Sequence, residues 1–253
     1  MGERAAEITP KVMAELFGQS SDLRRGLRDV YHLLPETRCQ RRALCCSLPP
    51  EMTLLEALTA VEQIAAMAPC MRMKVARRFI RYFLTNPVAL SSCPFLHGTD
   101  CRIYQGRFFG CRAYGLWSRA HYEGEAARNR QAKEVSRRQW EQLGVRLPRE
   151  VVEFQLPYCP HVEAVGEVEA KDGLLLEAQD RVEALSRRLG FWHEVYRATY
   201  FADVSFLLAS FAFGLHQAVA TKFSLVRDLV NTGEEGRLAH LMEEVPDICA
   251  RLF

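Results

Sequence analysis

The sequence predicts a mainly α-helical protein with an irregular, cysteine-rich loop segment packed among the helices. Apolar residues recur at spacings of three and four through most of the chain, which is the period of amphipathic helices. No segment alternates apolar and polar residues over several positions, so we expect any sheet to be small. Residues 88–115 break the helical period with glycines, aromatic residues and three cysteines.

The N-terminal part of the chain contains signals for three helices. A threonine–proline pair at residues 9–10 combines a capping residue with a proline at the first helical position, which predicts a helix to residue 17. Thr53 and Glu56 have the spacing of a capping box, which begins a second helix that we expect Pro69 to end. An amphipathic pattern then predicts a third helix, which stops before the Asn-Pro pair at residues 86–87.

The rest of the chain is also expected to be helical. Residues 118–143 are rich in Arg, Glu, Gln and Ala, which predicts an exposed helix, and the three prolines of residues 144–161 indicate a connector. Two apolar stripes at helical spacing follow: the first is Leu175, Ala178, Val182, Leu185 and Leu189, and the second is Leu238, Leu241, Val245, Ile248 and Leu252.

Between these stripes, residues 200–220 are long and apolar enough to resemble a membrane span. Asp203, His216 and Gln217 lie in or beside this stretch, and Gly214 interrupts it. Polar groups of this kind are costly in a bilayer. We therefore expect a buried core helix and no membrane span.

The bulk composition excludes some classes of protein. The chain has 253 residues, of which 49% are hydrophobic and 25% charged, as in a soluble globular protein with its own core. The formal net charge of +2 is too small to indicate nucleic-acid binding. No basic stretch followed by an apolar stretch opens the chain, so we expect no signal peptide and a cytoplasmic location. Thiols in such a reducing compartment stay free or bind metal, and nine cysteines, an odd number, suit a disulfide framework poorly.

Six of the nine cysteines lie close together in the sequence, in the groups Cys39, Cys45 and Cys46, and Cys93, Cys101 and Cys111. A tetrahedral soft-metal site needs about four thiolates, so this segment predicts a metal-binding loop with surplus ligands. The spacing lacks the C-x2-C-x2-C run of bacterial ferredoxins. Six arginines flank the cysteines and either offset the negative charge of thiolates or form a solvated surface: Arg38, Arg41, Arg42, Arg102, Arg107 and Arg112.

The residues between the cysteines form a more specific pattern. Residues 93–96 read CPFL, residues 101–104 read CRIY, and residues 111–114 read CRAY. Together with an upstream group that ends in adjacent cysteines, this pattern resembles the YkgJ-type cysteine-cluster family of zinc- or iron-chelating proteins over residues 36–115. The chain departs from that pattern in having one upstream cysteine fewer, and in having Phe108 after Arg107 where the family has proline.

The resemblance implies a metal site built from the six cysteines, and it leaves the metal open because four thiolates suit zinc as well as an iron–sulfur cluster. Some relatives in that family, the flagellin lysine N-methylases, are associated with an iron–sulfur cluster. A Cys-Pro step, found here at residues 93–94, also recurs in ferredoxin-type ligation. We therefore favour a [4Fe-4S] cluster, with zinc as the alternative.

The other candidate residues carry less weight. Cys159, in the connector, is either an extra ligand or a structural residue, and His97 is either a further ligand or a solvent-facing loop residue. We expect Cys70 and Cys249 to be small apolar core residues at helix edges. The sequence contains no phosphate-binding glycine loop, no G-x-S-x-G and no H-E-x-x-H.

The sequence thus suggests three regions and three functions. Residues 30–115 form a metal-binding region, residues 116–160 an exposed helix and connector, and residues 161–253 a helical region that packs on the rest or binds a protein partner. The first hypothesis is a [4Fe-4S] protein with an electron-transfer, sensing or structural role. The alternatives are a zinc-binding helical adaptor and a protein lysine N-methylase dependent on S-adenosylmethionine; the latter rests on the resemblance alone.

Overall fold

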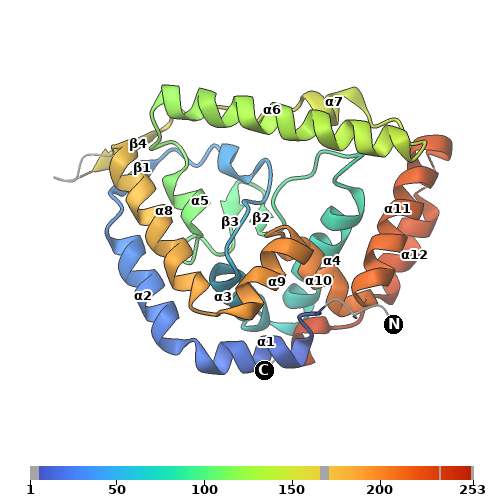
Figure 1. The fold of residues 1–253 in the computed structure, drawn as a ribbon, viewed down its shortest axis with the longest axis horizontal. Helices are drawn as coiled ribbons and strands as arrows, with labels where there is room; N and C mark the ends of the chain where they lie inside the picture. The colour runs from blue at the N-terminus through green and yellow to red at the C-terminus, as the bar shows by residue number, and fades with distance from the viewer. Residues whose placement is uncertain (1–5, 166–170, 234, 252–253) are drawn as a thin grey trace.

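The structure is a computed structural model that describes residues 6–165, 171–233 and 235–251. Within these ranges the chain is mainly helical, as expected (Figure 1). Its helices are α1 (Pro10–Gln19), α2 (Ser21–His32), α3 (Leu54–Ala65), α4 (Pro69–Thr85), α5 (Phe109–Ala113), α6 (Arg119–Gln142), α7 (Arg149–Glu153), α8 (Asp172–Arg187), α9 (Phe191–Tyr200), α10 (Val204–Phe213), α11 (Leu215–Thr232) and α12 (Gly236–Glu244). Four short strands are β1 (Glu36–Cys39), β2 (Leu96–His97), β3 (Asp100–Cys101) and β4 (Val162–Val165).

The sheet structure of the described residues consists of two small antiparallel pairs, as the lack of alternation predicted. In one pair, β1 lies against β4 with Cys39 opposite Val162. In the other, β2 and β3 form a hairpin with Leu96 opposite Cys101. The β1–β4 pair holds the connector that follows α7 against the loop that carries the first cysteines.

Helix α3 is the centre of the core, with α1, α2, α4, α8 and α9 around it. The Thr53 side-chain oxygen accepts a hydrogen bond from the Glu56 N–H, and Glu56 Oε2 accepts one from the Thr53 N–H, so the predicted capping box is present. The prediction for Pro69 was wrong. Helix α3 ends at Ala65, and Pro69 is the first residue of α4, where the N–H that proline lacks would have no helical partner.

Residues 200–220 span the end of α9, all of α10 and the first turns of α11, instead of the single core helix that we expected. Helices α10 and α11 are bent by 104° at the break between them. Gly214 occupies this break with a φ of +81°, a conformation that glycine adopts without steric cost. Residues 204–210 of α10 are buried, and α10 packs on α4 and α11, so the expected burial is confirmed for this part of the stretch. It is wrong for Phe201 and for most of the first two turns of α11, which are exposed. In the described part of the chain, no single helix is long and apolar enough to span a membrane, although the bent α10–α11 pair together meets that test.

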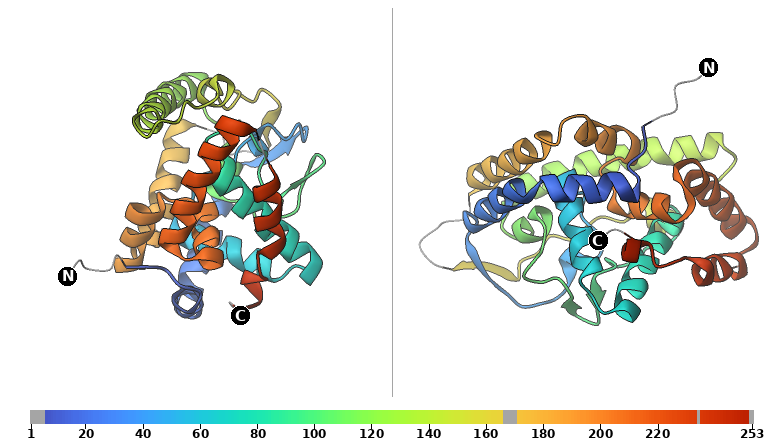
Figure 2. Two further views of the ribbon diagram at one scale, coloured as in Figure 1. Left: turned by 90° about the vertical axis from the view of Figure 1, so that its right-hand side faces the viewer. Right: turned by 90° about the horizontal axis from the view of Figure 1, so that it is seen from below.

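Helix α6 crosses one face of the molecule, on the side opposite α1 (Figures 1 and 2). None of its 24 residues is buried, which confirms the exposed helix predicted for residues 118–143. Near its C-terminal end, Trp140 stacks on Phe223 of α11 with ring centroids 5.6 Å apart. The connector after α6 contains the short helix α7, which the prolines of that segment did not predict.

The two C-terminal stripes have different outcomes. Helix α8 buries Leu175, Ala178 and Val182, as the first stripe predicted. The second stripe does not form one helix, because α12 ends at Glu244, just before a proline, and a 3-10 turn follows at Ile248–Arg251. Leu252, the last member of that stripe, lies outside the described residues.

Candidate metal centre

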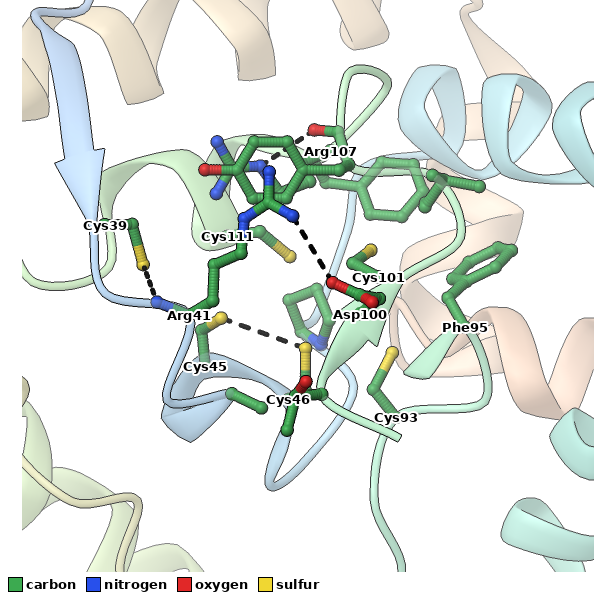
Figure 3. A pocket seen from close by; sticks show the side chains of 16 residues that line it. Cys39, Arg41, Cys45, Cys46, Cys93, Phe95, Asp100, Cys101, Arg107 and Cys111 are labelled. Carbon is green, nitrogen blue, oxygen red and sulfur yellow. Dashed lines mark hydrogen bonds and ion pairs between the residues drawn. The ribbon is translucent and has the colours of Figure 1, made fainter. Parts of the chain in front are cut away.

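All six predicted ligands line one cavity (Figure 3). They come from β1, the 3-10 turn Leu44–Cys46, the loop before β2, strand β3 and helix α5, and they are Cys39, Cys45, Cys46, Cys93, Cys101 and Cys111. All six are free thiols. The cavity contains about 690 Å³ of empty space, its open mouth included, so the side chains around it leave room for a bound group.

A tightly bent loop turns the first three cysteines toward the cavity. Arg41 and Ala43 have φ values of +53° and +55°. This left-handed conformation costs a residue with a Cβ roughly 1–2 kcal/mol. The Arg41 N–H donates to Cys39 Sγ at 3.3 Å, and the Cys46 N–H donates to the Ala43 carbonyl at 2.9 Å. Strained backbone of this kind persists where neighbouring contacts hold it, and it is concentrated at functional sites.

The β2–β3 hairpin positions the next two cysteines beside that loop. The Cys93 N–H donates to the Cys46 carbonyl at 2.7 Å, which links the two cysteine groups directly through the backbone. Cys101 stands opposite Leu96 in the hairpin. Arg78 of α4 donates to the carbonyls of Cys93 and Leu96 and so fixes the hairpin to a core helix.

The buried carboxylate of Glu56 anchors α5, which carries Cys111. Glu56 Oε1 accepts hydrogen bonds from the Phe109 N–H at 2.8 Å and from the Tyr31 hydroxyl at 2.7 Å. Phe109 is the first residue of α5, so its N–H has no partner within that helix. Glu56, the acidic member of the α3 capping box, thereby joins α2, α3 and α5, and it sets the position of Cys111 relative to the core.

Arginines and aromatic rings surround the thiols. The Arg107 guanidinium lies over the Tyr104 ring, 3.7 Å from its centroid, and its Nε donates to the Tyr104 carbonyl. Arg41 pairs with Asp100 at 3.4 Å, and both side chains are exposed at the mouth of the cavity. The buried side chains of Phe95 and Phe108 form an apolar part of the cavity wall. Such a wall excludes water and strengthens electrostatic interactions inside the cavity.

The thiols have unequal acidities. The hydrogen bond between Cys45 and Cys46, whose sulfur atoms are 3.8 Å apart, lowers the pKa of Cys45 to about 7 and raises the pKa of Cys46. Burial raises the pKa of Cys93 to about 12, and it also raises the pKa values of Cys101 and Cys111. In the metal-free protein, thiols with raised pKa values carry protons at neutral pH, and a bound metal would have to displace those protons.

The donor atoms fit a metal group by their chemistry, and their spacing distinguishes between kinds of group. Thiolates that share one tetrahedral ion lie roughly 3.8 Å apart, given zinc–sulfur bonds of about 2.3 Å. Among the described residues, no three His, Cys, Asp or Glu side chains are close enough to hold one ion. A [4Fe-4S] cluster binds each of its four thiolates through a different iron, so its ligands are farther apart than those of a single ion.

The structure places the other candidate residues as follows. His97 is exposed and does not line the cavity. Cys249 is buried, as expected, whereas Cys70 is exposed on the first turn of α4 and the prediction of a core position was wrong. Cys159 is buried and lines a second cavity, whose wall also includes Cys39, Cys45 and Cys111. The proximity of Cys159 to these thiols depends on the β1–β4 pairing, for which the sequence gives no local signal.

Comparisons of the chain with protein-family models, curated proteins and solved structures found no match. The resemblance to the YkgJ-type family therefore rests on the residues between the cysteines alone.

Proposed function

We propose that the protein binds a [4Fe-4S] cluster in the cavity that the six cysteines line. The observation that carries this proposal is the combination of six free thiols on one cavity with no three of them at the spacing of a single ion. Soft thiolates are the ligands of iron–sulfur clusters, and a cluster of four irons needs ligands spread over a larger volume than one zinc ion does.

Four of the six cysteines serve as ligands in this proposal. The Cys45 and Cys46 sulfurs are only 3.8 Å apart, a spacing that suits two thiolates on one metal atom, whereas each cluster iron takes one cysteine. One member of that pair therefore binds iron, together with Cys93, Cys101 and Cys111. The other member of the pair and Cys39 are the two remaining thiols. Cys39 lies at the edge of the group, at the end of β1, where its Sγ accepts a hydrogen bond from the Arg41 N–H (Figure 3).

The position of the cluster supports an electron-transfer or sensing role. Thr99 and Asp100 line the cavity and are exposed, so a cluster there lies close to the protein surface. Solvent exposure and hydrogen bonds to the sulfurs set the reduction potential of such clusters. A cytoplasmic location and a protein redox partner at this mouth are parts of the same proposal, because a reducing compartment keeps the thiols available.

Replacement of single cysteines by serine tests the ligand set. After anaerobic purification, the C93S, C101S and C111S variants should each lose most of the visible absorbance and the bound iron, because each removes one ligand. The C39S variant is the matched control and should keep both. Full iron content in C101S and C111S would contradict the ligand set.

Zinc at the same thiols is the competing function, and the 3.8 Å separation of the Cys45 and Cys46 sulfurs favours it. Its remaining ligands would have to move from the positions described above. A colourless protein that contains one zinc ion per chain and no sulfide after anaerobic purification would replace the cluster with a zinc site.

A further inference from the structure

A second cavity adjoins the first one behind the wall formed by Cys39, Cys45 and Cys111. It contains about 380 Å³ of empty space, its mouth included. Its other polar lining side chains include Arg42, Arg107, Arg112, Tyr114 and His161. They come from the loop after β1, from the segment that leads into α5, from α5 and the residue after it, and from the segment before β4.

This cavity is rich in basic residues. Arg42, Arg107 and Arg112 line it beside four cysteines, and no Asp or Glu among the described residues does. The first cavity differs, because Asp100 lines it and pairs with Arg41. Positive groups without a carboxylate partner in a partly enclosed space form a binding site for anions.

Two of the three guanidiniums are held in fixed positions. The Arg107 guanidinium lies over the Tyr104 ring, and its Nε donates a hydrogen bond to the Tyr104 carbonyl. Arg112 lies 4.7 Å from the centroid of the Tyr31 ring and donates from Nε to the Arg107 carbonyl at 2.7 Å. Arg112 also donates from Nη2 to the Gln105 carbonyl, and neither arginine uses all of its donors in these contacts. Guanidiniums preorganised in this way lose little entropy when they bind a carboxylate or a phosphate.

The arginines of the second cavity are not explained by the metal group alone. Arg107 lines both cavities, but Arg42 and Arg112 line only the second. These two residues therefore border a space that the cluster would not occupy. Gly115, with a φ of +83°, allows β4 to pack closely beside the second cavity, because a Cβ there would lie 2.8 Å from Cγ2 of Val162 in β4.

We propose that the second cavity binds a small molecule through its carboxylate or phosphate group, held by Arg42, Arg107 and Arg112 next to the cysteine wall. This site goes beyond metal binding, and it stands whichever metal the first cavity holds. It places an anionic substrate or effector directly beside the thiols that the two cavities share.

Thermal melts of the full-length protein as purified, with increasing sodium phosphate or sodium acetate at an ionic strength kept constant with sodium chloride, test this proposal. The rise in melting temperature should saturate for at least one of the two anions. The R42Q variant should weaken the apparent affinity for that anion by about tenfold, which is the loss of one charge-assisted hydrogen bond. The R102Q variant is the matched control, because Arg102 is exposed and lines neither cavity.

The result identifies the ligand class and separates this proposal from the metal site. Tighter binding of phosphate indicates a phosphate ester, and tighter binding of acetate indicates a carboxylate. Equal responses of the wild type and R42Q would overturn the proposal, as would binding that occurs only after the metal is removed. The R107K variant, which keeps the charge but loses the fork of donors, provides the same comparison if R42Q melts at a lower temperature without anion.

Discussion

Removal of the Glu56 carboxylate should destabilise the fold and the cysteine site together. Glu56 is 3% exposed and accepts hydrogen bonds from Thr53, Tyr31 and the Phe109 N–H. The E56A variant leaves the last two donors without an acceptor, at about 1–3 kcal/mol each, and removes a helix cap worth about 1 kcal/mol. We therefore expect the free energy of unfolding to fall by about 3–7 kcal/mol.

Urea denaturation of E56A, E56Q and T53A measures this effect. T53A removes the cap but keeps the link between α3 and α5, so it should cost only about 1 kcal/mol. E56Q should lie between the other two, because its amide keeps one acceptor oxygen. Labelling of Cys111 by a thiol reagent without denaturant should accelerate in E56A and not in T53A. Equal stability losses in E56A and T53A would refute the role of Glu56 as the anchor of α5.

Three further predictions concern the thiols and the C-terminal turn. Metal analysis should show that one of the variants C45S and C46S loses bound iron and that the other retains it. Equal iron loss in both variants would contradict the assignment of a single ligand to that pair. In the metal-free protein the pKa of Cys93 is raised to about 12, so its proton stabilises the fold below about pH 8.5 and this contribution is lost as the pH rises toward 12. Melts above pH 8.5 should thus show a steeper loss of stability in the wild type than in C93S. Arg72 Nη2 lies 2.6 Å from Asp247 Oδ2, and the hydrogen bonds from Arg72 lower the pKa of that carboxyl. R72Q should therefore lower the free energy of unfolding measured by urea denaturation at pH 7, and this loss should shrink as the pH falls below about 4 and the Asp247 carboxylate is protonated.

The features that the sequence predicted well depend on neighbouring residues. The capping box of Thr53 and Glu56 is a pattern of four consecutive positions, and it forms as expected. The exposed helix at residues 118–143 follows from its composition in the same way. Pro69 was misinterpreted because a proline stands equally well after a helix or at its first position, and only the packing of α4 decides between the two.

The features that the sequence could not predict depend on contacts between distant segments. Glu56 was identified as a capping residue, but its hydrogen bonds to Tyr31 and Phe109 join three helices and have no local pattern. The position of Cys159 beside Cys39 follows from the pairing of two four-residue strands, which are too short to be recognised from alternation. The grouping of the six cysteines was expected, whereas the second cavity and its arginines were visible only in the structure.

The proposed cluster of iron and sulfide in the cysteine cavity can be measured by quantitative iron, zinc and acid-labile sulfide analysis of the anaerobically purified protein. We expect four iron atoms and four sulfides per chain, with zinc near zero. Stoichiometric zinc without sulfide would contradict this proposal, and so would a protein that binds neither metal after anaerobic reconstitution with iron and sulfide.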